Sequence, residues 1–190
     1  MGQHIVIFTT EHLIIRTATL DDADFLFSLW TNPAVMTNVG FPQGLRTSRE
    51  KVAAQITSKE KPPFNQVLMV ALQKTGKIIG QCKMTLPNEE GISTTDVKLH
   101  PDHWGHKYGV EIKRSLVDYL FRKTDCIAVE ATPNKANLAS IKMQEAVGGI
   151  RVGEAVYKFP EEMHAYTQSI HHYIYRVYRE SWPNTNLQIK

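Results

Sequence analysis

The chain has 190 residues, of which 42% are hydrophobic and 22% charged, and its formal net charge is +3. This length and composition predict one globular domain and argue against a disordered chain or a fibrous repeat. The lysines and arginines are too scattered to indicate nucleic-acid binding, and the apolar runs are too short to cross a membrane. The N-terminus shows no secretory pattern, and Cys82 and Cys126 lie in apolar runs as buried free thiols would, so we expect a cytoplasmic protein.

The N-terminal half is predicted to combine strands with two short helices. Apolar patterning predicts strands at residues 5–8, 13–16, 67–72, 77–84 and 91–99, with a hairpin turn at 74–76. The first helix is capped at Thr19 or Asp21 and stops at residues 32–33, where a proline occurs. The second helix covers about 48–56.

The C-terminal half is predicted to alternate helices with strands. A helix over about 106–122 has a buried stripe formed by Val110, Ile112, Leu116, Val117, Leu120 and Phe121. A strand at 126–131 follows, and then a helix at 137–147 that ends at Gly148. Two long strands, 150–159 and 169–179, close the chain as an antiparallel pair. We therefore expect a single α+β domain over residues 1–190, with 183–190 as a loose tail.

The segment 99–111, Leu-His-Pro-Asp-His-Trp-Gly-His-Lys-Tyr-Gly-Val-Glu, is the most informative part of the chain. A strand ends there, a turn follows, and Gly105 and Gly109 flank the start of a helix. Free backbone N–H groups converge at such a point, and the helix dipole and the small residues favour an anion close to the main chain. A glycine-bearing turn before a helix is more often purely structural, so this pattern needs support from elsewhere in the chain.

That support comes from a family resemblance. The segment resembles the coenzyme A-binding motif of the GNAT acyltransferase superfamily, Gln/Arg-x-x-Gly-x-Gly/Ala. It is most similar to the ribosomal-protein-alanine acetyltransferase branch, whose members often read Tyr-Trp-Gly-Lys-Gly-Tyr-Ala-Thr-Glu where this chain has residues 103–111. The resemblance covers nearly the whole chain and includes the segments 10–16, 29–36, 137–140, 148–153 and 175–182.

The resemblance implies both a fold and a reaction. The fold would be a mixed, mostly antiparallel sheet of about seven strands flanked by about four helices, splayed between the fourth and fifth strands. The reaction would transfer an acetyl group from acetyl-CoA to a primary amine by direct attack of the amine. The acceptor would be a protein N-terminal α-amine or a small-molecule amine. Neither a metal nor a membrane partner is expected, and a homodimer is left open.

The resemblance also assigns residues to the coenzyme. Main-chain groups of Val97 and Leu99 would hold the pantetheine arm as an added strand. Asn137 and Ser140 would lie near the same arm, and Asn137 is equally expected to cap its helix. The pyrophosphate would lie on the N–H groups of the segment formed by Trp104, Gly105, His106, Lys107, Tyr108, Gly109 and Val110.

Two positions depart from the motif. Asp102 stands at the usual Gln or Arg, and Lys107 stands at the usual second Gly or Ala. The Lys107 side chain is expected either to contact the pyrophosphate as a point charge or to crowd the turn.

The catalytic groups of the family are only partly matched. The place of the family's Glu base falls on Thr94, so Asp96, two residues later on the same side of the strand, is the candidate base or water-holding residue. A solvated strand residue is the alternative for Asp96. The place of the family's Tyr acid falls on Gln144, and Ser140 is the candidate in its stead, against a role in helix capping or packing.

The lack of the family's usual base and acid bears on the choice of substrate. At pH 7 roughly 10–15% of an α-amine is neutral, against about 0.04% of a lysine amine, so an α-amine or another amine of low pKa needs less help from a base. A different function, a coenzyme A-binding sensor or scaffold with weak or lost catalysis, is the alternative.

Histidines recur at every third position within the segment 99–111, at His100, His103 and His106, with Asp102 among them. They straddle a turn and a helix start, so no regular geometry gathers them into a zinc site. We therefore predict no metal.

Overall fold

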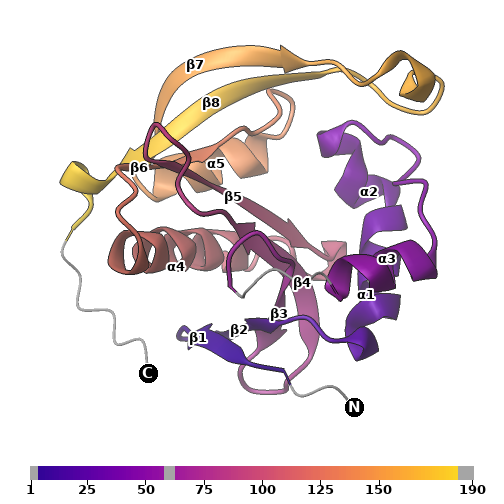
Figure 1. The fold of residues 1–190 in the computed structure, drawn as a ribbon, viewed down its shortest axis with the longest axis horizontal. Coiled ribbons are helices and arrows are strands. Elements are labelled where there is room, and N and C mark those ends of the chain that lie inside the picture. The colour runs from indigo at the N-terminus through magenta and orange to yellow at the C-terminus, as the bar shows by residue number, and fades with distance from the viewer. Residues whose placement is uncertain (1–3, 58–62, 184–190) are drawn as a thin grey trace.

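The computed structural model describes residues 4–57 and 63–183 of the chain. A central sheet runs through the described part, with helices on both of its faces (Figure 1). The predicted loose tail, residues 183–190, lies outside the described residues except for Pro183. None of the described helices is long and apolar enough to span a bilayer.

Eight strands form the sheet, in the order β1-β2-β3-β4-β5-β6-β8-β7. Neighbouring strands are antiparallel, except that β5 and β6 run parallel. The predicted α+β class and the mixed, mostly antiparallel sheet are confirmed. The strands are β1 (Val6–Thr9), β2 (Leu13–Thr17), β3 (Leu68–Leu72), β4 (Ile78–Met84), β5 (Ile92–Leu99), β6 (Ala128–Ala131), β7 (Ile150–Tyr157) and β8 (Ile170–Tyr178).

The described residues form five α-helices, against about four predicted, and the additional one is short. They are α1 (Ala23–Thr31), α2 (Pro33–Met36), α3 (Arg49–Ile56), α4 (Tyr108–Lys123) and α5 (Leu138–Ala146). The first helix ends where predicted, with Asn32 as the C-cap of α1, but an unpredicted short helix begins at once with Pro33. The Asn32 side chain accepts a hydrogen bond from the Ala34 N–H at 2.9 Å, and Pro33 occupies the first turn, where a missing N–H costs nothing. The same two residues end α1 and begin α2.

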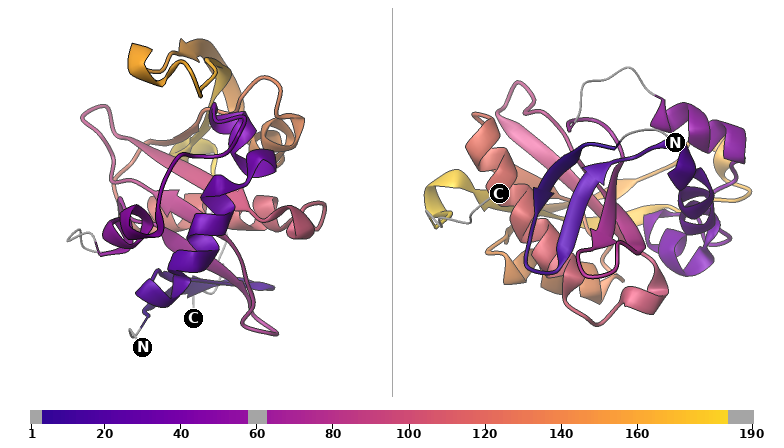
Figure 2. Two further views of the ribbon diagram at one scale, coloured as in Figure 1. Left: turned by 90° about the vertical axis from the view of Figure 1, so that its right-hand side faces the viewer. Right: turned by 90° about the horizontal axis from the view of Figure 1, so that it is seen from below.

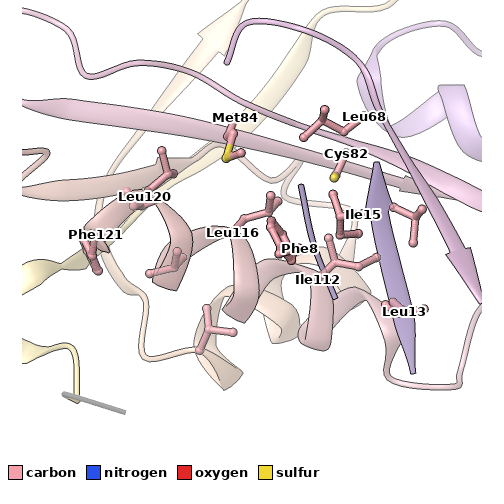
Figure 3. Packing of buried hydrophobic residues seen from close by; sticks show 14 of the residues in the cluster. Phe8, Leu13, Ile15, Leu68, Cys82, Met84, Ile112, Leu116, Leu120 and Phe121 are labelled. Carbon is pink, nitrogen blue, oxygen red and sulfur yellow. The ribbon is translucent and has the colours of Figure 1, made fainter. Parts of the chain in front are cut away.

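The helices lie on opposite faces of the sheet and make two cores. Leu68 and Val70 of β3 pack with Ile112 and Leu116 of α4, in the core that Figure 3 shows from close by. Met69 packs with α1, α2 and α3 on the other face. Successive residues of a strand point to opposite faces, so one strand supplies both cores.

Both cysteines are buried and free, as predicted. Cys82 lies in the core between the sheet and α4 (Figure 3). Burial raises the pKa of its thiol, and the negative charge of Asp96 raises it further. The thiol therefore stays protonated and unreactive at neutral pH.

A buried ion pair fixes the connection from β2 to α1. The Arg16 guanidinium donates to both carboxylate oxygens of Asp22, at 2.8 and 2.7 Å, and the Thr19 N–H donates to one of them at 2.8 Å. Burial alone would raise the pKa of Asp22, but the hydrogen bonds from Arg16 and Thr19 outweigh it and hold this pKa below its usual value. The carboxylate thus stays charged while only 2% exposed.

The sheet opens between β5 and β6. Their pairing runs only from Ile92 opposite Ala128 to Thr94 opposite Glu130, whereas β5 continues to Leu99. Residues 95–99 therefore have β4 on one side and no strand on the other. The family resemblance implied this splay between the fourth and fifth strands. Here it lies between β5 and β6, because the chain has one additional strand, β1, at its start.

Candidate active site

A cleft of about 870 Å³ lies where β5 and β6 diverge. Its walls come from residues 95–99 of β5, the turn before α4 and the first turns of α4, the residues after β6, and α5. Every predicted site residue lines this cleft except His106, whose exposed ring stacks on Tyr108 with 5.6 Å between centroids.

The free edge of β5 faces this cleft. The Thr85 N–H donates to the Thr94 carbonyl at 3.0 Å, and the His100 N–H donates to the Ile79 carbonyl at 2.9 Å, so the even-numbered residues direct their main-chain groups to β4. Main-chain groups alternate between the two edges of a strand. Val97 and Leu99 therefore direct theirs towards the missing strand, as the prediction for a pantetheine arm requires.

One of these groups is already occupied. The Trp104 indole N–H donates to the carbonyl of Leu99 at 2.9 Å, although the ring itself is 47% exposed. Trp104 therefore fixes the end of β5 to the turn that follows it. The Leu99 N–H and both main-chain groups of Val97 remain directed at the open side.

The turn before α4 presents a row of unpaired amides. Among the described residues, no partner accepts a hydrogen bond from the N–H groups of residues 105–109. Val110 differs from the prediction, because its N–H donates to the carbonyl of Lys107 at 3.1 Å and so belongs to the helix. Gly105 and Lys107 both have positive φ, of 79° and 64°. Successive amides around such residues form a concave anion-binding nest at the positive end of the helix dipole.

Lys107 caps α4 in a left-handed conformation that suits glycine far better than lysine. Its side chain is exposed and lines the cleft, so it does not crowd the turn. Gly109, two residues later, approaches α5 closely. A Cβ atom there would lie 3.1 Å from the sulfur of Met143, so the small residue permits the contact between α4 and α5.

Glu111 holds the first turn of α4 against the N-terminal hairpin, whose strands lie beside that helix in Figure 2. Its Oε1 accepts hydrogen bonds from the Thr10 hydroxyl at 2.5 Å and from the His12 N–H at 2.9 Å. A carboxylate in the first turn of a helix is also favoured by the helix dipole. The partners lie 99 and 101 residues away along the chain, so a local motif carries no signal for them.

Asn137 and Ser140 lie at the start of α5, on the opposite wall. The Asn137 side-chain oxygen accepts a hydrogen bond from the Ser140 N–H at 3.1 Å, which confirms Asn137 as the helix cap. The Asn137 amide nitrogen and the Ser140 hydroxyl have no hydrogen-bond partner among the described residues, and both residues line the cleft. Each can therefore donate to a bound molecule while the cap stays intact.

Asp96 lies beside the splay, on the face opposite α4. It forms an ion pair of 2.5 Å with Lys98, and Thr94 is hydrogen-bonded to Thr85. Glu130 was not among the predicted site residues, and the β5–β6 register places it directly opposite Thr94. Glu130 and Asp96 both line a second cavity of about 340 Å³ that shares its Asp96 wall with the main cleft. Glu130 is paired with Arg176 at 2.9 Å.

The other end of the cleft is closed by segments far apart in the sequence. The loop between β7 and β8 reaches the residues after α2 (Figure 1), where the Gln168 N–H donates to the Gly40 carbonyl at 2.9 Å. Phe41 and Phe159 stack edge to face there, with 5.1 Å between centroids. A Cβ atom on Gly40 would lie 2.4 Å from the Phe159 ring, so this contact requires glycine.

Lys113 is a cleft residue that the sequence interpretation missed. It lies on the buried face of α4, is 1% exposed, and donates a hydrogen bond to the Thr95 hydroxyl at 2.5 Å. A signal was present, because position 113 falls on the same helical stripe as Leu116, Val117 and Leu120. Gln144, at the family's Tyr position, is also buried and lines the cleft.

The charges in the cleft are mainly positive. Among the described residues that line it, Asp96 is the one carboxylate, whereas Lys98, Lys107, Lys113 and Lys142 are cationic when protonated. The described residues contain no group of three His, Cys, Asp or Glu side chains arranged to hold a metal ion. His100 instead lies 3.4 Å from Asp102.

Comparison with known proteins gives a consistent result. The sequence model of the family described as "Acetyltransferase (GNAT) domain" matches residues 12–150. The uncharacterized N-acetyltransferase p20 of Bacillus licheniformis is 26% identical over 136 residues, which cover 70% of this chain and 76% of that protein.

Solved structures share the fold at low sequence identity. A GNAT-family acetyltransferase from Bacillus anthracis superposes with a TM-score of 0.74 at 19% identity, covering 91% of this chain and 98% of that one. A putative ribosomal-protein-serine acetyltransferase from Vibrio cholerae gives 0.71 at 15% identity, covering 90% and 96%. The spermidine N-acetyltransferase of Vibrio cholerae, in complex with CoA and spermine, gives 0.71 at 15% identity, covering 88% and 94%.

Proposed function

The chain belongs to the GNAT acetyltransferase family, and we propose that this N-acetyltransferase moves the acetyl group of acetyl-CoA to an α-amine, or to another amine of low pKa, rather than to a polyamine. The similarity of segment 103–111 to the ribosomal-protein acetyltransferases supports a protein N-terminus as one such acceptor. The shared fold with the ribosomal-protein-serine acetyltransferase is consistent with that choice.

The coenzyme would occupy the open edge of β5. Its pyrophosphate would accept hydrogen bonds from the free amides of residues 105–109, where the helix dipole and the Lys107 charge favour an anion. Its pantetheine arm would run beside Val97 as the missing strand and meet the donors of Asn137 and Ser140 on the opposite wall. This arrangement explains why several main-chain groups in the cleft have no partner in the described part of the chain.

The reaction needs a neutral amine at the thioester carbonyl. Asp96, on the face of the sheet opposite α4, would accept the proton that the amine loses, directly or through a water molecule. Its ion pair with Lys98 holds the carboxylate in position beside the cleft. The Ser140 hydroxyl would hydrogen-bond the sulfur of the leaving thiol.

The observation that carries the substrate proposal is the charge of the cleft. A polyamine has several positive charges, which carboxylates must balance when it binds. Asp96 is the one carboxylate among the described lining residues, and Lys98 already neutralises it. The cleft would therefore offer a polyamine no unpaired carboxylate for its additional charges, and it would favour an acceptor with one amine.

Two peptides of one sequence test the proposal. The first has a free N-terminal α-amine and a blocked lysine, and the second has a blocked N-terminus and a free lysine; spermidine is the third acceptor. Release of free thiol from acetyl-CoA is followed for each between pH 6 and 10, in the wild-type protein and in Asp96→Asn. These pH limits span roughly the range between the two amine pKa values.

We expect the highest kcat/KM at pH 7 for the free α-amine. Faster turnover of spermidine at every pH would contradict the proposal. Tight binding of coenzyme A, measured by calorimetry, without turnover of any amine would favour the alternative of a sensor or scaffold.

A further inference from the structure

Lys113 places a cationic group beneath the point where the sheet opens. Its Nζ atom donates a hydrogen bond to the Thr95 hydroxyl at 2.5 Å. Thr95 follows Thr94, the last residue of β5 that pairs with β6. The Lys113 side chain is 1% exposed, yet it lines the cleft, so the small part that remains accessible faces the proposed coenzyme site.

Among the described residues, no carboxylate forms an ion pair with this ammonium group. The one carboxylate in the described cleft lining, Asp96, lies two residues from Lys98 on the opposite face and is paired with it. Burial lowers the pKa of Lys113 to about 7. The other ionisable groups that share the cleft are Lys98 on β5, His103, Lys107 and Tyr108 around the start of α4, Lys142 on α5, Tyr157 on β7 and His172 on β8.

A buried lysine without a carboxylate is a poor choice for stability. Desolvation of an ammonium group is costly, and an apolar side chain of similar volume would pack at this position without that cost. The neighbouring stripe residues Leu116 and Val117 are apolar, as the rest of this helix face requires. The position of Lys113 in the cleft wall therefore points to a role in the reaction.

The length of the open edge places the reacting end of the coenzyme at Lys113. An arm anchored at the amides of residues 105–109 enters beside Leu99 and runs towards Thr95. Four residues of β5 cover about 13 Å, at roughly 3.3 Å per residue. An arm that fills the missing strand from Leu99 onwards thus ends near Thr95, above the Lys113 ammonium.

We propose that Lys113 protonates the coenzyme A thiolate that leaves when the thioester is cleaved. The amine nitrogen forms a bond to the carbonyl carbon, and the carbon–sulfur bond breaks with its electron pair on sulfur. The thiolate takes a proton from Lys113 Nζ, which becomes a neutral amine. Lys113 then regains a proton from solvent, and the surplus proton of the new amide nitrogen passes to Asp96 or water. This inference rests on the proposed function, because it requires acetyl-CoA in the cleft.

The acid strengths favour Lys113 over the alternatives. A thiol has a pKa near 8.5, so a proton on a group of pKa about 7 moves downhill to a thiolate. A serine hydroxyl is a much weaker acid than a thiol, so Ser140 can hydrogen-bond the sulfur but cannot be the source of the proton. The side-chain amide of Gln144 is not an acid at all in this range.

The test uses coenzyme A itself and needs no acceptor. The thiol of bound coenzyme A is titrated between pH 5 and 10 by the ultraviolet absorbance of the thiolate, in the wild-type protein and in Lys113→Met. A cation within a few ångströms should lower the pKa of the bound thiol by about 1 unit relative to free coenzyme A, which is less than the difference between the thiol and Lys113 and so still leaves the proton on sulfur. The two groups titrate as a coupled pair, so both steps are fitted together.

The matched control is Lys123→Met, which makes the same substitution at an exposed position in the last turn of the same helix. We expect the lowered thiol pKa in wild type and in Lys123→Met, and a pKa at or above that of free coenzyme A in Lys113→Met. Binding of coenzyme A is measured for each protein by calorimetry, and folding by thermal unfolding. Should Lys113→Met fail to fold, Lys113→Gln replaces it.

Three results would overturn the inference. Equal thiol pKa values in wild type and Lys113→Met, with coenzyme A bound to both, would overturn it and leave the proposed function standing. Failure of the wild-type protein to bind coenzyme A would remove both. A stable acetyl group on Lys113 after incubation with acetyl-CoA, detected by mass spectrometry, would show that Lys113 is an acyl acceptor and not the acid.

Discussion

The carboxylate of Glu111 accepts a hydrogen bond from the main-chain N–H of His12, at 2.9 Å across 99 residues of sequence. The His12 ring lies beside the other carboxylate oxygen, at 3.0 Å. Glu111 is the fourth residue of α4, two residues after the last of the free amides. The N-terminal hairpin therefore fixes the position and direction of the proposed phosphate site, although no residue of the hairpin lines the cleft.

Glu111→Ala should destabilise the protein and weaken coenzyme A binding together. It leaves the Thr10 hydroxyl and the His12 N–H without their acceptor, which should cost about 1–3 kcal/mol in the free energy of unfolding. Urea unfolding and calorimetric titration with coenzyme A measure the two effects. Glu111→Gln keeps an acceptor oxygen in place and should lose clearly less of both. An unchanged affinity in the alanine variant would show that the hairpin does not support the phosphate site.

Substitutions at Lys107 separate backbone strain from charge. The left-handed conformation costs a non-glycine residue about 1–2 kcal/mol, and glycine gives back about 0.5–1 kcal/mol through the entropy of the unfolded chain. Lys107→Gly should therefore raise the free energy of unfolding by roughly 0.5–1 kcal/mol, whereas Lys107→Ala keeps the strain and should change it little. Both variants remove the charge, so both should lower the affinity for coenzyme A by a similar factor of about five, most clearly at low salt. A loss of affinity in only one variant would show that the conformation of the turn, and not the charge, governs binding.

Thr94→Glu should extend the activity to amines of high pKa. Thr94 is exposed at the place where many members of the family have their Glu, and a carboxylate there would accept the proton of a charged amine. We expect kcat/KM at pH 7 to rise about tenfold for a lysine side-chain amine and much less for an α-amine, since positioned bases contribute factors of about 10²–10⁴ at best. Thr94→Gln, similar in size but without a charge, is the control. An equal gain for both amines would mean that the substitution acts on binding and not on the proton.

The buried Lys113 should give the folded protein a distinctive dependence on pH. In the folded state its pKa is about 7, and in the unfolded chain it is near 10.5. Between these values the unfolded chain holds a proton that the folded protein does not, so raising the pH favours folding by up to about 1.4 kcal/mol per unit. Lys113→Met has no lysine to titrate at this position. The difference in unfolding free energy between the two proteins should therefore change by up to about 1.4 kcal/mol per pH unit between pH 7 and 10. Parallel pH profiles would show that Lys113 titrates normally.

The Arg16–Asp22 pair should dominate stability in acid. Asp22→Asn leaves the largely buried Arg16 without its counter-charge and should cost about 3–5 kcal/mol at neutral pH. Because the pKa of Asp22 is lowered in the folded state, this contribution is complete above about pH 4 and is lost as the pH falls through the folded pKa. The exposed pair of Arg49 and Asp24 is the matched control, and Asp24→Asn should cost less than about 1 kcal/mol. Equal losses in the two variants, measured by urea unfolding at pH 7 and 3, would contradict the assignment.

The sequence predicted most of the fold because its signals are local. Strand and helix periodicity placed β3, β4, β5 and α4 within about two residues of their observed bounds. The short helix α2 was not predicted, because Asn32 and Pro33, which end α1 as expected, also begin the next helix. The proposed coenzyme-binding segment could also be identified from the sequence, since its glycine turn and its helix start are adjacent in the chain.

The residues that the sequence did not yield owe their roles to distant partners. Glu130 meets Thr94 only through the pairing of β5 with β6, and the position of Glu111 matters only because a hairpin 99 residues away reaches it. Lys113 reads as one more charged residue of an amphipathic helix until the register of α4 against β5 is known. Long-range contacts of this kind follow no regular spacing in the sequence, so no local pattern predicts them.

The bare run of β5 at residues 95–99 has a further consequence. Exposed strand edges usually lie at the rim of a sheet, where they recruit strands from other chains and promote aggregation. Here the bare edge lies in the middle of the sheet, inside a cleft. Under the proposed function, coenzyme A takes the place of the missing strand. A ligand that binds only the folded state shifts the folding equilibrium in proportion to its concentration. The lifetime of this protein, and its tendency to associate with other chains, should therefore follow the supply of coenzyme in its surroundings.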